Sequence, residues 1–513
     1  MGILIKNGRV TVGDAAGTVH ERADVLVRDG LIAAVGPDLV AAEGDEIIDA
    51  SRSLVLPGFV DAHMHSNEGF EMGRYDNLPL ELWLAEVYPP TGSPALTWRD
   101  HYLRAMLVGI VSVRSGVTML QDDVISMAFD PNAVDATATA YRDLGLRANI
   151  TSSMWDESFT GSLPFVSDLL SPELATEFSA PTRLDWRDQL DLYRDQVARW
   201  NGRDADGHDA AGEDGIRIIL GPCGPQRCTD RLLEEVAAIS AADDVPIHCH
   251  VLETRTQAVT GQVHYGRTLV ERLRDLGALT SRLTMNHAIW LTPHDIELMG
   301  EAQCAITHNP LANLKLGSGT APVRRLLAAG VTVALGCDGV ASADTADIFA
   351  AIKLASMVHK VGTTDYREWI GAEDVYRMVT LGGARSAGLQ DRIGTIEVGR
   401  DADIILLDRD DWGFLPLHDE RRQLAFSVGS EAVQTSIVRG RVVLRDRRLA
   451  LVDEDALRAE IAEAAERFRR DVTPELSRGA AIVRPALDEM YARAMAWGPL
   501  PLPVGNPRFD GPF

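Results

Sequence analysis

The stretch VPIHCHVLETR, residues 245–255, combines an apolar run with two histidines and a glutamate. If residues 245–251 form a strand, side chains alternate between its faces, so His248 and His250 share one face. Glu253 follows three residues after His250. Taken alone, the pattern also fits a half-buried strand whose histidines have hydrogen-bond partners. Histidines and acids at the ends of other strands must decide whether this face binds something.

The stretch is one of eight apolar segments that alternate with amphipathic helical segments. They read GFVDAHMH, VGIVSVRSGVTMLQDD, LRANITSSM, IRIILGP, VPIHCHVL, LTMNHAIWL, CAITHN and VTVALGCDG. Eight apolar strands with helices between them predict an α/β fold, the TIM-like (β/α)8 barrel, whose parallel strands are nearly continuously apolar. We expect this barrel to span residues 58–385.

Short strands with glycine-containing turns flank this middle part on both sides. Residues 1–57 and 386–453 show the period-two alternation of strands. Because chain ends commonly lie close together, we expect both flanks to form one small β-sandwich, with the barrel inserted between them. Residues 454–513 are expected to form a charged amphipathic helix and a proline-rich tail, which pack on the barrel or on a neighbouring chain.

The composition excludes several classes of function. The 513 residues carry a formal net charge of −25, which opposes binding to nucleic acid and to acidic membrane surfaces. No apolar run reaches the roughly 18 residues of a membrane span, and the amino terminus lacks an export signal. Five scattered cysteines without a C-x-x-C pair fit a reducing cytoplasm. We therefore expect small-molecule chemistry in the cytoplasm and, from the carboxyl-terminal segment, a homo-oligomer.

Residue types that bind metals stand at the ends of four predicted strands. They are His63 and His65 in the first strand, His250 in the fifth, His287 in the sixth and Asp338 in the eighth. Active sites of (β/α)8 barrels gather at the carboxyl ends of the strands. Each residue alone has a structural explanation, since an aspartate before glycine, for example, is commonly a turn residue. Together they indicate one functional site.

These segments resemble a known family. PGFVDAHMH, HVLET, NHAIW, HNPLANLKLGSG and LGCDGVAS are similar, in this order, to signature segments of the amidohydrolase superfamily. The branch they resemble contains aminohydrolases and chlorohydrolases: cytosine, guanine and S-adenosylhomocysteine deaminases and the triazine hydrolases. The similarity covers residues 1 to about 450 and is far more specific for the superfamily than for a substrate.

The resemblance implies one divalent metal ion, zinc or alternatively iron. Its ligands would be His63, His65, His250 and Asp338; the catalytic residues would be Glu253 as proton shuttle, His287 to polarise or orient substrate and water, and Asp338 to accept the water proton. A metal with three nitrogen ligands and an open position lowers the pKa of bound water to about 7. Hydroxide would then attack an electron-poor ring carbon, and Glu253 would protonate the ring nitrogen and the leaving group. His248 is expected to be a packing residue or to support a ligand.

Because both Glu253 and Asp338 are present, we expect an aminohydrolase that releases ammonia from an aminated heterocycle or cyclic amidine. Two alternatives stay within the superfamily: a chlorohydrolase, which expels chloride without protonating it as an amine, and a ring-opening hydrolase of cyclic amides or amidines. A barrel that serves only as a scaffold is disfavoured, since the ligands and acids are intact.

The residues that would recognise the substrate depart from those of the adenosine-type deaminases in the branch. Such members resemble G-P-H-A-P-Y-T-C where this chain has GPCGPQRC, so Cys223 replaces a histidine that touches the nucleoside. They also have an acid for the ribose hydroxyls near the position of Thr91 and Gly92. Both differences argue against an adenosine-type substrate.

Several other residues are candidates for a substrate pocket. We expect substrate binding by Glu68, Glu71, Trp83, Cys223, Arg227 and His287, with Asn67, Phe70 and Arg74 as further candidates. Such acids and arginines equally pair with one another or face solvent, and an aromatic residue is more often packed in the core. The loop LANLKLGSG, residues 311–319, is typical of the branch, but its role is not readable from the sequence.

Overall fold

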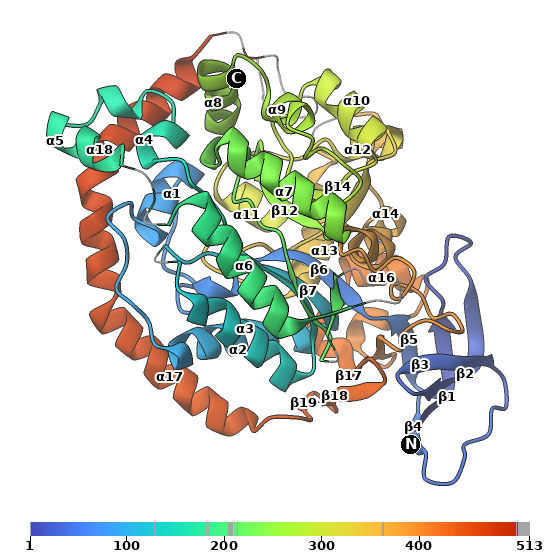
Figure 1. Cartoon of the computed structure of the whole chain (residues 1–513). Helices are drawn as coiled ribbons and strands as arrows, with labels where there is room; N and C mark the ends of the chain where they lie inside the picture. Colours follow the sequence, from blue (N-terminus) through green and yellow to red (C-terminus); the bar gives the residue numbers. More distant parts are fainter. Residues whose placement is uncertain are drawn as a thin grey trace.

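The computed structural model describes residues 2–498 and 500, apart from residues 128, 181, 183, 204–208, 213 and 362–363. Its centre is a set of parallel strands in two hydrogen-bonded sheets, with the orders β11-β8-β7-β6 and β12-β13-β14-β15 (Figure 1). The strands are β6 (Phe59–Met64), β7 (Val117–Val124), β8 (Arg147–Ser152), β11 (Ile216–Ile219), β12 (Ile247–Val251), β13 (Leu283–His287), β14 (Ala305–His308) and β15 (Thr332–Leu335).

Backbone hydrogen bonds join the two sheets into a closed ring. The amide of His248 in β12 donates to the carbonyl of Leu220, just after β11, at 2.9 Å. On the other side, the amide of Asp338, just after β15, donates to the carbonyl of His63 in β6 at 2.8 Å. The predicted (β/α)8 barrel is therefore confirmed.

Helices surround the ring (Figure 1). Those between successive barrel strands, or after the last, include α2 (Trp98–Arg114), α3 (Pro131–Leu144), α6 (Trp186–Trp200), α7 (Asp230–Asp243), α8 (Arg255–Tyr265), α9 (Leu269–Asp275), α10 (Pro293–Ala302), α12 (Val323–Ala328), α13 (Ile348–Val358) and α14 (Ala372–Arg377). One expected strand was too long: residues 108–114 belong to α2, and β7 begins only at Val117. An apolar helix face and an apolar strand look alike over so short a run.

Shorter elements lie in the connections. They are α1 (Leu80–Val87), α4 (Phe159–Ser162), α5 (Pro172–Phe178), β9 (Asn201–Arg203), β10 (Asp209–Ala211), α11 (Pro310–Lys315), α15 (Gly383–Ser386) and α16 (Glu420–Phe426). Two of them bear on the site, since α1 follows the first barrel strand and α11 follows β14. Active-site residues of this fold are carried on such connections at the carboxyl ends of the strands.

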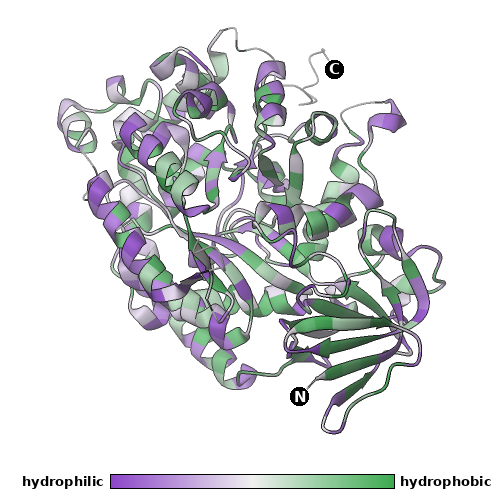
Figure 2. Cartoon of the chain, turned by 45° about the vertical axis from the view of Figure 1, so that its right-hand side comes forward, coloured by the Kyte–Doolittle hydropathy of each residue, from purple (hydrophilic) through white to green (hydrophobic). Residues whose placement is uncertain are grey.

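Both flanks build one small β domain, as predicted (Figure 2). Its strands form a single hydrogen-bonded sheet in the order β19-β18-β17-β16-β5-β1-β2-β3, with β4 paired to β1. They are β1 (Ile3–Thr11), β2 (Val19–Arg28), β3 (Leu31–Gly36), β4 (Glu46–Asp49), β5 (Ser53–Pro57), β16 (Ile404–Asp408), β17 (Val433–Val438), β18 (Arg441–Arg445) and β19 (Arg448–Leu449). The junction between the flanks is the antiparallel pair β5 and β16, where Leu54 lies opposite Leu407. The domain limits at residues 57, 385 and 453 stay predictions.

The carboxyl-terminal segment forms two long helices, α17 (Glu454–Asp471) and α18 (Thr473–Ala496), which run along one side of the barrel (Figure 1). The sequence predicted only the first. Helix α17 packs on α2, and α18 packs on α1 and α8 of the same chain. The apolar contact includes Val483, Leu487 and Met490 against Leu82 and Val259. The expected proline-rich tail lies almost entirely outside the described residues.

None of the described helices has the length and apolar character that crossing a bilayer requires.

Candidate active site

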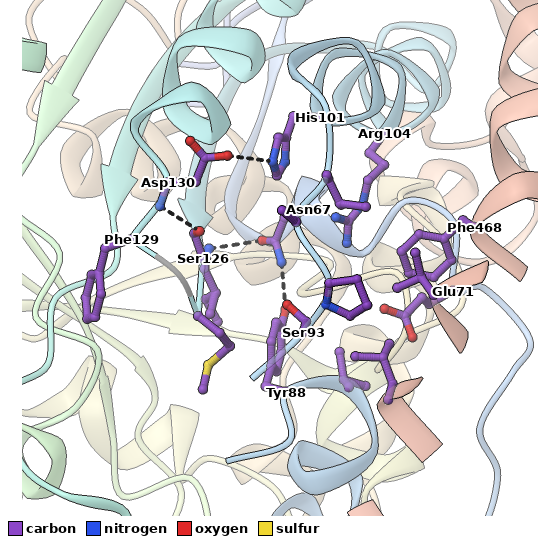
Figure 3. Close-up of a pocket in the computed structure, with 18 of the residues that line it drawn as sticks. Asn67, Glu71, Tyr88, Ser93, His101, Arg104, Ser126, Phe129, Asp130 and Phe468 are labelled. Atoms are coloured by element: carbon purple, nitrogen blue, oxygen red, sulfur yellow. Dashed lines mark hydrogen bonds and ion pairs between the residues drawn. The ribbon is translucent and has the colours of Figure 1, made fainter. Parts of the chain in front are cut away.

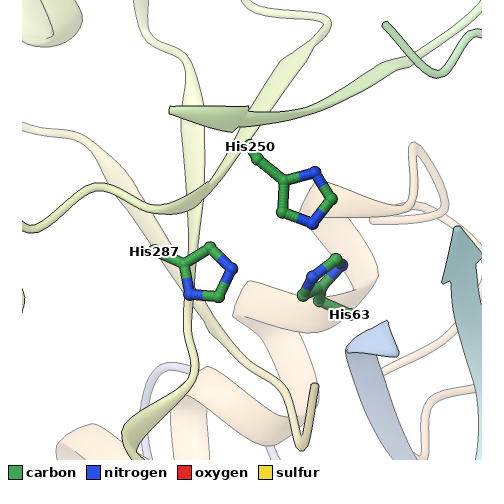
Figure 4. A group of neighbouring side chains, drawn as sticks. All are labelled: His63, His250 and His287. Atoms are coloured by element: carbon green, nitrogen blue, oxygen red, sulfur yellow. The ribbon is translucent and has the colours of Figure 1, made fainter. Parts of the chain in front are cut away.

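The four metal ligands predicted from the sequence and the predicted catalytic residue His287 meet at the carboxyl end of the barrel. Three of them, His63 from β6, His250 from β12 and His287 from β13, direct their rings toward a common space (Figure 4). His63, His65 and Asp338 form a second group whose possible ligand atoms all lie within 4.8 Å of one another. The rings come together because each strand ends at the same rim of the barrel.

Hydrogen bonds on one side of each ring leave the other nitrogen free. His65 Nδ1 lies 2.7 Å from the carbonyl of Asp123, and His250 Nδ1 lies 2.8 Å from the carbonyl of Cys223. A carbonyl only accepts, so both Nδ1 atoms carry the proton, and in the neutral form of each ring Nε2 keeps a lone pair. These two Nε2 atoms are 3.2 Å apart. Two bare nitrogens at this distance fit a shared cation.

His248 explains the pair of histidines in the fifth strand. Its Nε2 lies 2.8 Å from Nδ1 of His63, so its ring holds the ring of this predicted metal ligand in place. This agrees with the expectation that His248 is a packing residue or supports a ligand. The Nε2 atom of His63 is buried without a hydrogen-bond partner and lies 3.3 Å from Oδ1 of Asp338. Burial, together with the neighbouring imidazoles, holds the pKa of His63 well below its usual value, which keeps the ring neutral.

Asp338 lies in a segment with a strained backbone. It has φ of +69°, and Leu252, His287 and Ala288 nearby also have positive φ. Such conformations are uncommon for non-glycine residues and are tolerated where the surrounding structure imposes them. Oδ1 of Asp338 lies 3.4 Å from Nε2 of His65, while Oδ2 lies 3.9 Å from Nε2 of His287. The carboxylate therefore bridges the histidine pair of β6 and the histidine of β13.

The donor set fits a divalent metal. Neutral imidazole nitrogens with free lone pairs and one carboxylate oxygen are the ligands that zinc and related ions prefer. The buried, unbonded Nε2 of His63 is costly unless something binds it. Carbonyl hydrogen bonds behind His65 and His250 fix the ring orientation as they do in known metal sites.

Glu253 and His287 lie beside this cluster. Oε2 of Glu253 is 3.7 Å from Nε2 of His287, and Oε1 has no partner. Burial and the nearby carboxylates of Asp338 and Glu81 hold the pKa of Glu253 well above its usual value, so this carboxyl can carry a proton near neutral pH. The group is placed as a general acid requires, and its raised pKa favours the protonated form.

The loop LANLKLGSG has a readable role in the structure. Its Asn313, in α11, places Oδ1 2.8 Å from Nδ1 of His287, so Nδ1 donates and Nε2 faces Glu253 and Asp338 with a lone pair. Burial lowers the pKa of His287, which keeps the ring neutral. A neutral His287 in this tautomer accepts a hydrogen bond at Nε2.

A small chamber of about 60 Å³ opens beside the cluster. Of the six predicted substrate-binding residues, five line it: Glu68, Trp83, Cys223, Arg227 and His287. The sixth does not. Glu71 lines a neighbouring pocket, where its Oε2 accepts from Tyr75 at 2.7 Å and from Arg74 at 3.0 Å. Among the further candidates, Phe70 packs edge-on against Phe468, with ring centroids 5.9 Å apart.

Glu68 is a fully buried carboxylate in the chamber wall. Tyr88 donates to Oε1 at 2.8 Å, and the amide of Ala341 donates to Oε2 at 3.0 Å. A Cβ atom on Gly339 would lie 2.0 Å from Oε2, so only glycine lets the carboxylate lie against this backbone. Burial raises the pKa of Glu68 to about 7.

Four residues of the site were not singled out in the sequence: Tyr88, Asp123, Gln257 and Asn313. Gln257 lines the chamber and accepts from the backbone amide of Glu253 at 2.9 Å. Asp123 lies behind His250, with Oδ2 3.7 Å from Nδ1. The acidic pair that ends the second predicted strand was an available signal for Asp123, whereas nothing in the local sequence marks Tyr88.

A larger outer pocket of about 380 Å³ continues from the chamber. The two share Leu80, Leu84, Tyr88, Gln226, Arg227 and Gln257 as lining residues. Thr91 and Gly92 line the outer pocket, as does Glu81, which is buried. Thr254 donates to Oε1 of Glu81 at 2.5 Å, and Oε2 has no partner. An acid therefore borders the outer pocket although position 91 is a threonine.

Comparison with known proteins agrees with this geometry. The model of the amidohydrolase family matches residues 54–443, most of the chain. The chain belongs to the amidohydrolase family. The resemblance inferred from the sequence is confirmed, and with it the assignment as a metal-dependent aminohydrolase, a hydrolase of non-peptide carbon–nitrogen bonds.

Curated relatives in this family are similar over almost their whole length. The chain is 31% identical to a 5'-deoxyadenosine deaminase of Methanosarcina mazei, over 90% of this chain and 98% of the relative. It is 33% identical to a 5-methylthioadenosine/S-adenosylhomocysteine deaminase of Desulforudis audaxviator, over 92% and 100%.

Solved structures of family members superpose closely. An adenosine deaminase from Xanthomonas campestris with bound zinc is 27% identical, with a TM-score of 0.78 over 91% of this chain and 98% of that one. A variant of an atrazine chlorohydrolase from Arthrobacter aurescens TC1, in complex with zinc and atraton, is 25% identical, with a TM-score of 0.80 over 90% and 100%.

Proposed function

We propose that this amidohydrolase holds one divalent ion, zinc with iron as the alternative, through His63, His65, His250 and Asp338, and releases ammonia from an aminated purine. The free Nε2 atoms of the histidines and the adjacent Oδ1 of Asp338 support this ligand set. The zinc in two similar structures supports the choice of metal. When bound at such a site, a divalent ion lowers the pKa of a water to about 7.

The side chains around the cluster would each move or hold a proton. Asp338 is placed to take the proton of the attacking water through Oδ2, which faces His287. His287, neutral and with Nε2 bare, would accept a hydrogen bond from that water and so orient it toward the ring carbon. Glu253, whose raised pKa favours the protonated form, would donate a proton to the ring nitrogen and so make the carbon electrophilic.

The position of Glu253 beside the metal-binding cluster is the observation that carries the proposal. An amine leaves readily only after protonation, so a deaminase needs a buried acid that is protonated near pH 7 and lies beside the reacting carbon. Glu253 is buried with a raised pKa, and it lies 3.7 Å from His287 with one oxygen free of partners. A chlorohydrolase does not need this acid for its leaving group.

We further propose a nucleoside-type substrate, with 5'-modified adenosines as the first compounds to test. The curated deaminases support this class, and they outweigh the expectation drawn from Cys223 and Thr91. The chamber and the outer pocket would take the base and its substituent respectively. Glu81, with a free Oε2 in the wall of the outer pocket, would accept hydroxyl donors in place of the acid missing at position 91.

The test is Glu253→Gln, assayed for metal content and ammonia release with 5'-deoxyadenosine. We expect full metal content, because Glu253 is not an assigned ligand, and a kcat lower by roughly 10²-fold or more. Glu173→Gln is the matched control, since Glu173 is an exposed acid of α5 that lines neither the chamber nor the outer pocket. Normal turnover of the Glu253→Gln variant with full metal would refute the acid's role.

A substrate panel separates the alternatives. Adenosines, free amino-heterocycles, a cyclic amide and a chlorinated triazine would be compared by release of ammonia or chloride, or by ring opening. Chloride release that persists in the Glu253→Gln variant would move the function to a chlorohydrolase. The cytoplasmic setting, which five buried free cysteines suit, and the homo-oligomer stay predictions.

A further inference from the structure

A second pocket, of about 400 Å³, lies next to the catalytic chamber. We call it the Arg104 pocket (Figure 3). Its walls come from the segment after β6, from α2, from the β7–α3 connection and from the junction of α17 and α18, which supplies Phe468, Val472 and Leu476. It shares only Tyr88 and Ile125 with the residues that line the chamber.

Arg104 is the unusual residue of this pocket. Its side chain comes from α2 and reaches into the pocket (Figure 3), and the residue is only 6% exposed. Within the described part of the chain, no carboxylate forms an ion pair with it, and its Nε is unbonded. The contact found for the guanidinium is the ring of Phe468, 5.4 Å from Cζ. Glu71, Glu68 and Asp100 stabilise this charge from a distance, but no anion of the described residues contacts it, and a buried guanidinium without a contacting anion is unfavourable.

The nearest acids do not fill this role. Glu71, on the facing wall, accepts hydrogen bonds at Oε2 from Arg74 and Tyr75. Arg74 in turn donates to the carbonyl of Thr473 at 3.3 Å, which anchors Glu71 to the start of α18. Asp130 lies on the far side of His101, with Oδ2 3.5 Å from Nε2. Burial and Arg104 lower the pKa of His101 to about 4, so this ring is uncharged at neutral pH.

The lining defines the chemistry of the missing partner. Apolar side chains of the α17–α18 junction and of Val87 and Leu96 line the pocket around the cation. One guanidinium in a pocket that also contains two acids favours a single negative charge over a phosphate dianion. A carboxylate matches the planar fork of arginine. We propose that the Arg104 pocket binds a small monocarboxylate, with its carboxylate on Arg104 and an apolar body against α17 and α18.

The pocket wall is coupled to the chamber by hydrogen bonds. Asn67, which lines the Arg104 pocket, donates to the hydroxyl of Tyr88 at 2.8 Å, and Tyr88 donates to Glu68 in the chamber wall. The other end of the Asn67 amide accepts from the backbone of Ile125 at 3.1 Å. Two alternative molecules would supply the carboxylate. One is a free acid bound beside the chamber, and the other is a substrate whose distal end passes Tyr88.

The binding test uses full-length, metal-loaded protein and hexanoate, with hexanamide as the neutral probe. Melting temperature and ligand-observed NMR would be measured for the wild type, Arg104→Gln, Arg104→Met and the control Arg99→Gln, an exposed arginine of the same helix paired with Glu460. We expect hexanoate, and not hexanamide, to bind the wild type and Arg99→Gln, and to bind both Arg104 variants at least about tenfold more weakly.

Stability without ligand distinguishes binding from a structural role. Removing an unpartnered buried cation should leave the melting temperature of Arg104→Met equal to or above that of the wild type. A lower melting temperature of Arg104→Met would overturn the proposal. Equal hexanoate binding by the wild type and Arg104→Gln would overturn it too, because hexanoate would then bind elsewhere, at the metal cluster. Absence of hexanoate binding in the wild type would overturn it as well. These measurements need no turnover, so they fail independently of the proposed reaction.

Kinetics then identify the source of the carboxylate. S-adenosylhomocysteine carries a carboxylate, and 5'-methylthioadenosine does not. If the pocket holds the substrate's distal end, Arg104→Gln raises KM for the first compound alone, and hexanoate competes with it. If the pocket holds a free acid, KM for both compounds is unchanged by Arg104→Gln, and hexanoate binds together with substrate.

Discussion

At the amino end of the barrel, the buried guanidinium of Arg147 lies between Asp401 and Asp403. At the carboxyl end, in contrast, four histidines and three acids lie together, and several of their atoms have no hydrogen-bond partner. Arg147 Nε donates to Asp403 at 2.8 Å, and the other oxygen of Asp403 accepts from the backbone of Arg439 at 2.8 Å. Both ends bury charge, but the oxygens of Asp403 are hydrogen-bonded, whereas Nε2 of His63 and Oε1 of Glu253 at the carboxyl end have no hydrogen-bond partner. Unsatisfied geometry, and not buried charge alone, marks the functional end.

The largest effect is expected from His65→Ala at the carboxyl end. Loss of a ligand should remove the metal and lower kcat/KM by at least about 10³-fold, because the attacking water is then no longer activated. Metal analysis and ammonia release measure both, and the wild type should hold about one ion per chain. His264→Ala, an exposed histidine on α8, is the control. Two ions per chain, or full metal in His65→Ala, would contradict the assigned site.

Arg147→Met, at the amino end of the barrel, should give the next largest effect. We expect it to lower the stability and to leave catalysis unchanged. It removes the ion-pair partner of the buried Asp403 and leaves Asp401 with Arg392 alone, which costs about 3–5 kcal/mol in the free energy of unfolding. Chemical denaturation measures this loss. Arg470→Met is the control: Arg470 forms an exposed ion pair with Asp471, and its substitution should cost about 0–1 kcal/mol. The folded fraction should keep its metal and its kcat. A loss of metal in Arg147→Met would show that the two ends are not separate.

Asn313→Ala should have the smallest of the three effects. Without its hydrogen bond, His287 loses a fixed ring orientation and tautomer, and kcat should fall about 10- to 100-fold while metal content is unchanged. A double-mutant cycle with His287→Ala gives the decisive measurement. If Asn313 acts through His287, the double variant is no worse than His287→Ala; additive losses would assign Asn313 a different role.

The sequence was sufficient to predict those site residues that lie directly at the ends of strands. Period-two alternation placed His250 and His248 on the same face, and the structure finds the first at the open cluster and the second behind His63. Local motifs were enough because each ligand follows directly from one strand. Glu253 is equally local, since it lies three residues beyond His250.

The remaining parts depend on contacts between distant segments. Glu71 was expected in the substrate pocket, but its side chain turns to Tyr75 and Arg74, toward the α17–α18 junction. Tyr88 reaches Glu68 across a helix and a loop, which no spacing in the sequence reveals. Helix α18 was missed because Pro474 and Pro485 weaken its pattern, although proline is favoured in a first turn and its cost inside a helix can be met by packing.

The pairing of β5 with β16 sets an order of events during synthesis. Strand β5 leaves the ribosome long before its neighbour β16, since the whole barrel is made between them. The amino-terminal strands must therefore wait, with an unpaired edge at β5, until Leu407 and its neighbours emerge. The barrel strands have their neighbours sooner and can assemble first. The small domain thus becomes complete only after the barrel strands have been made, and a release of the chain before residue 404 would leave that edge exposed to other chains.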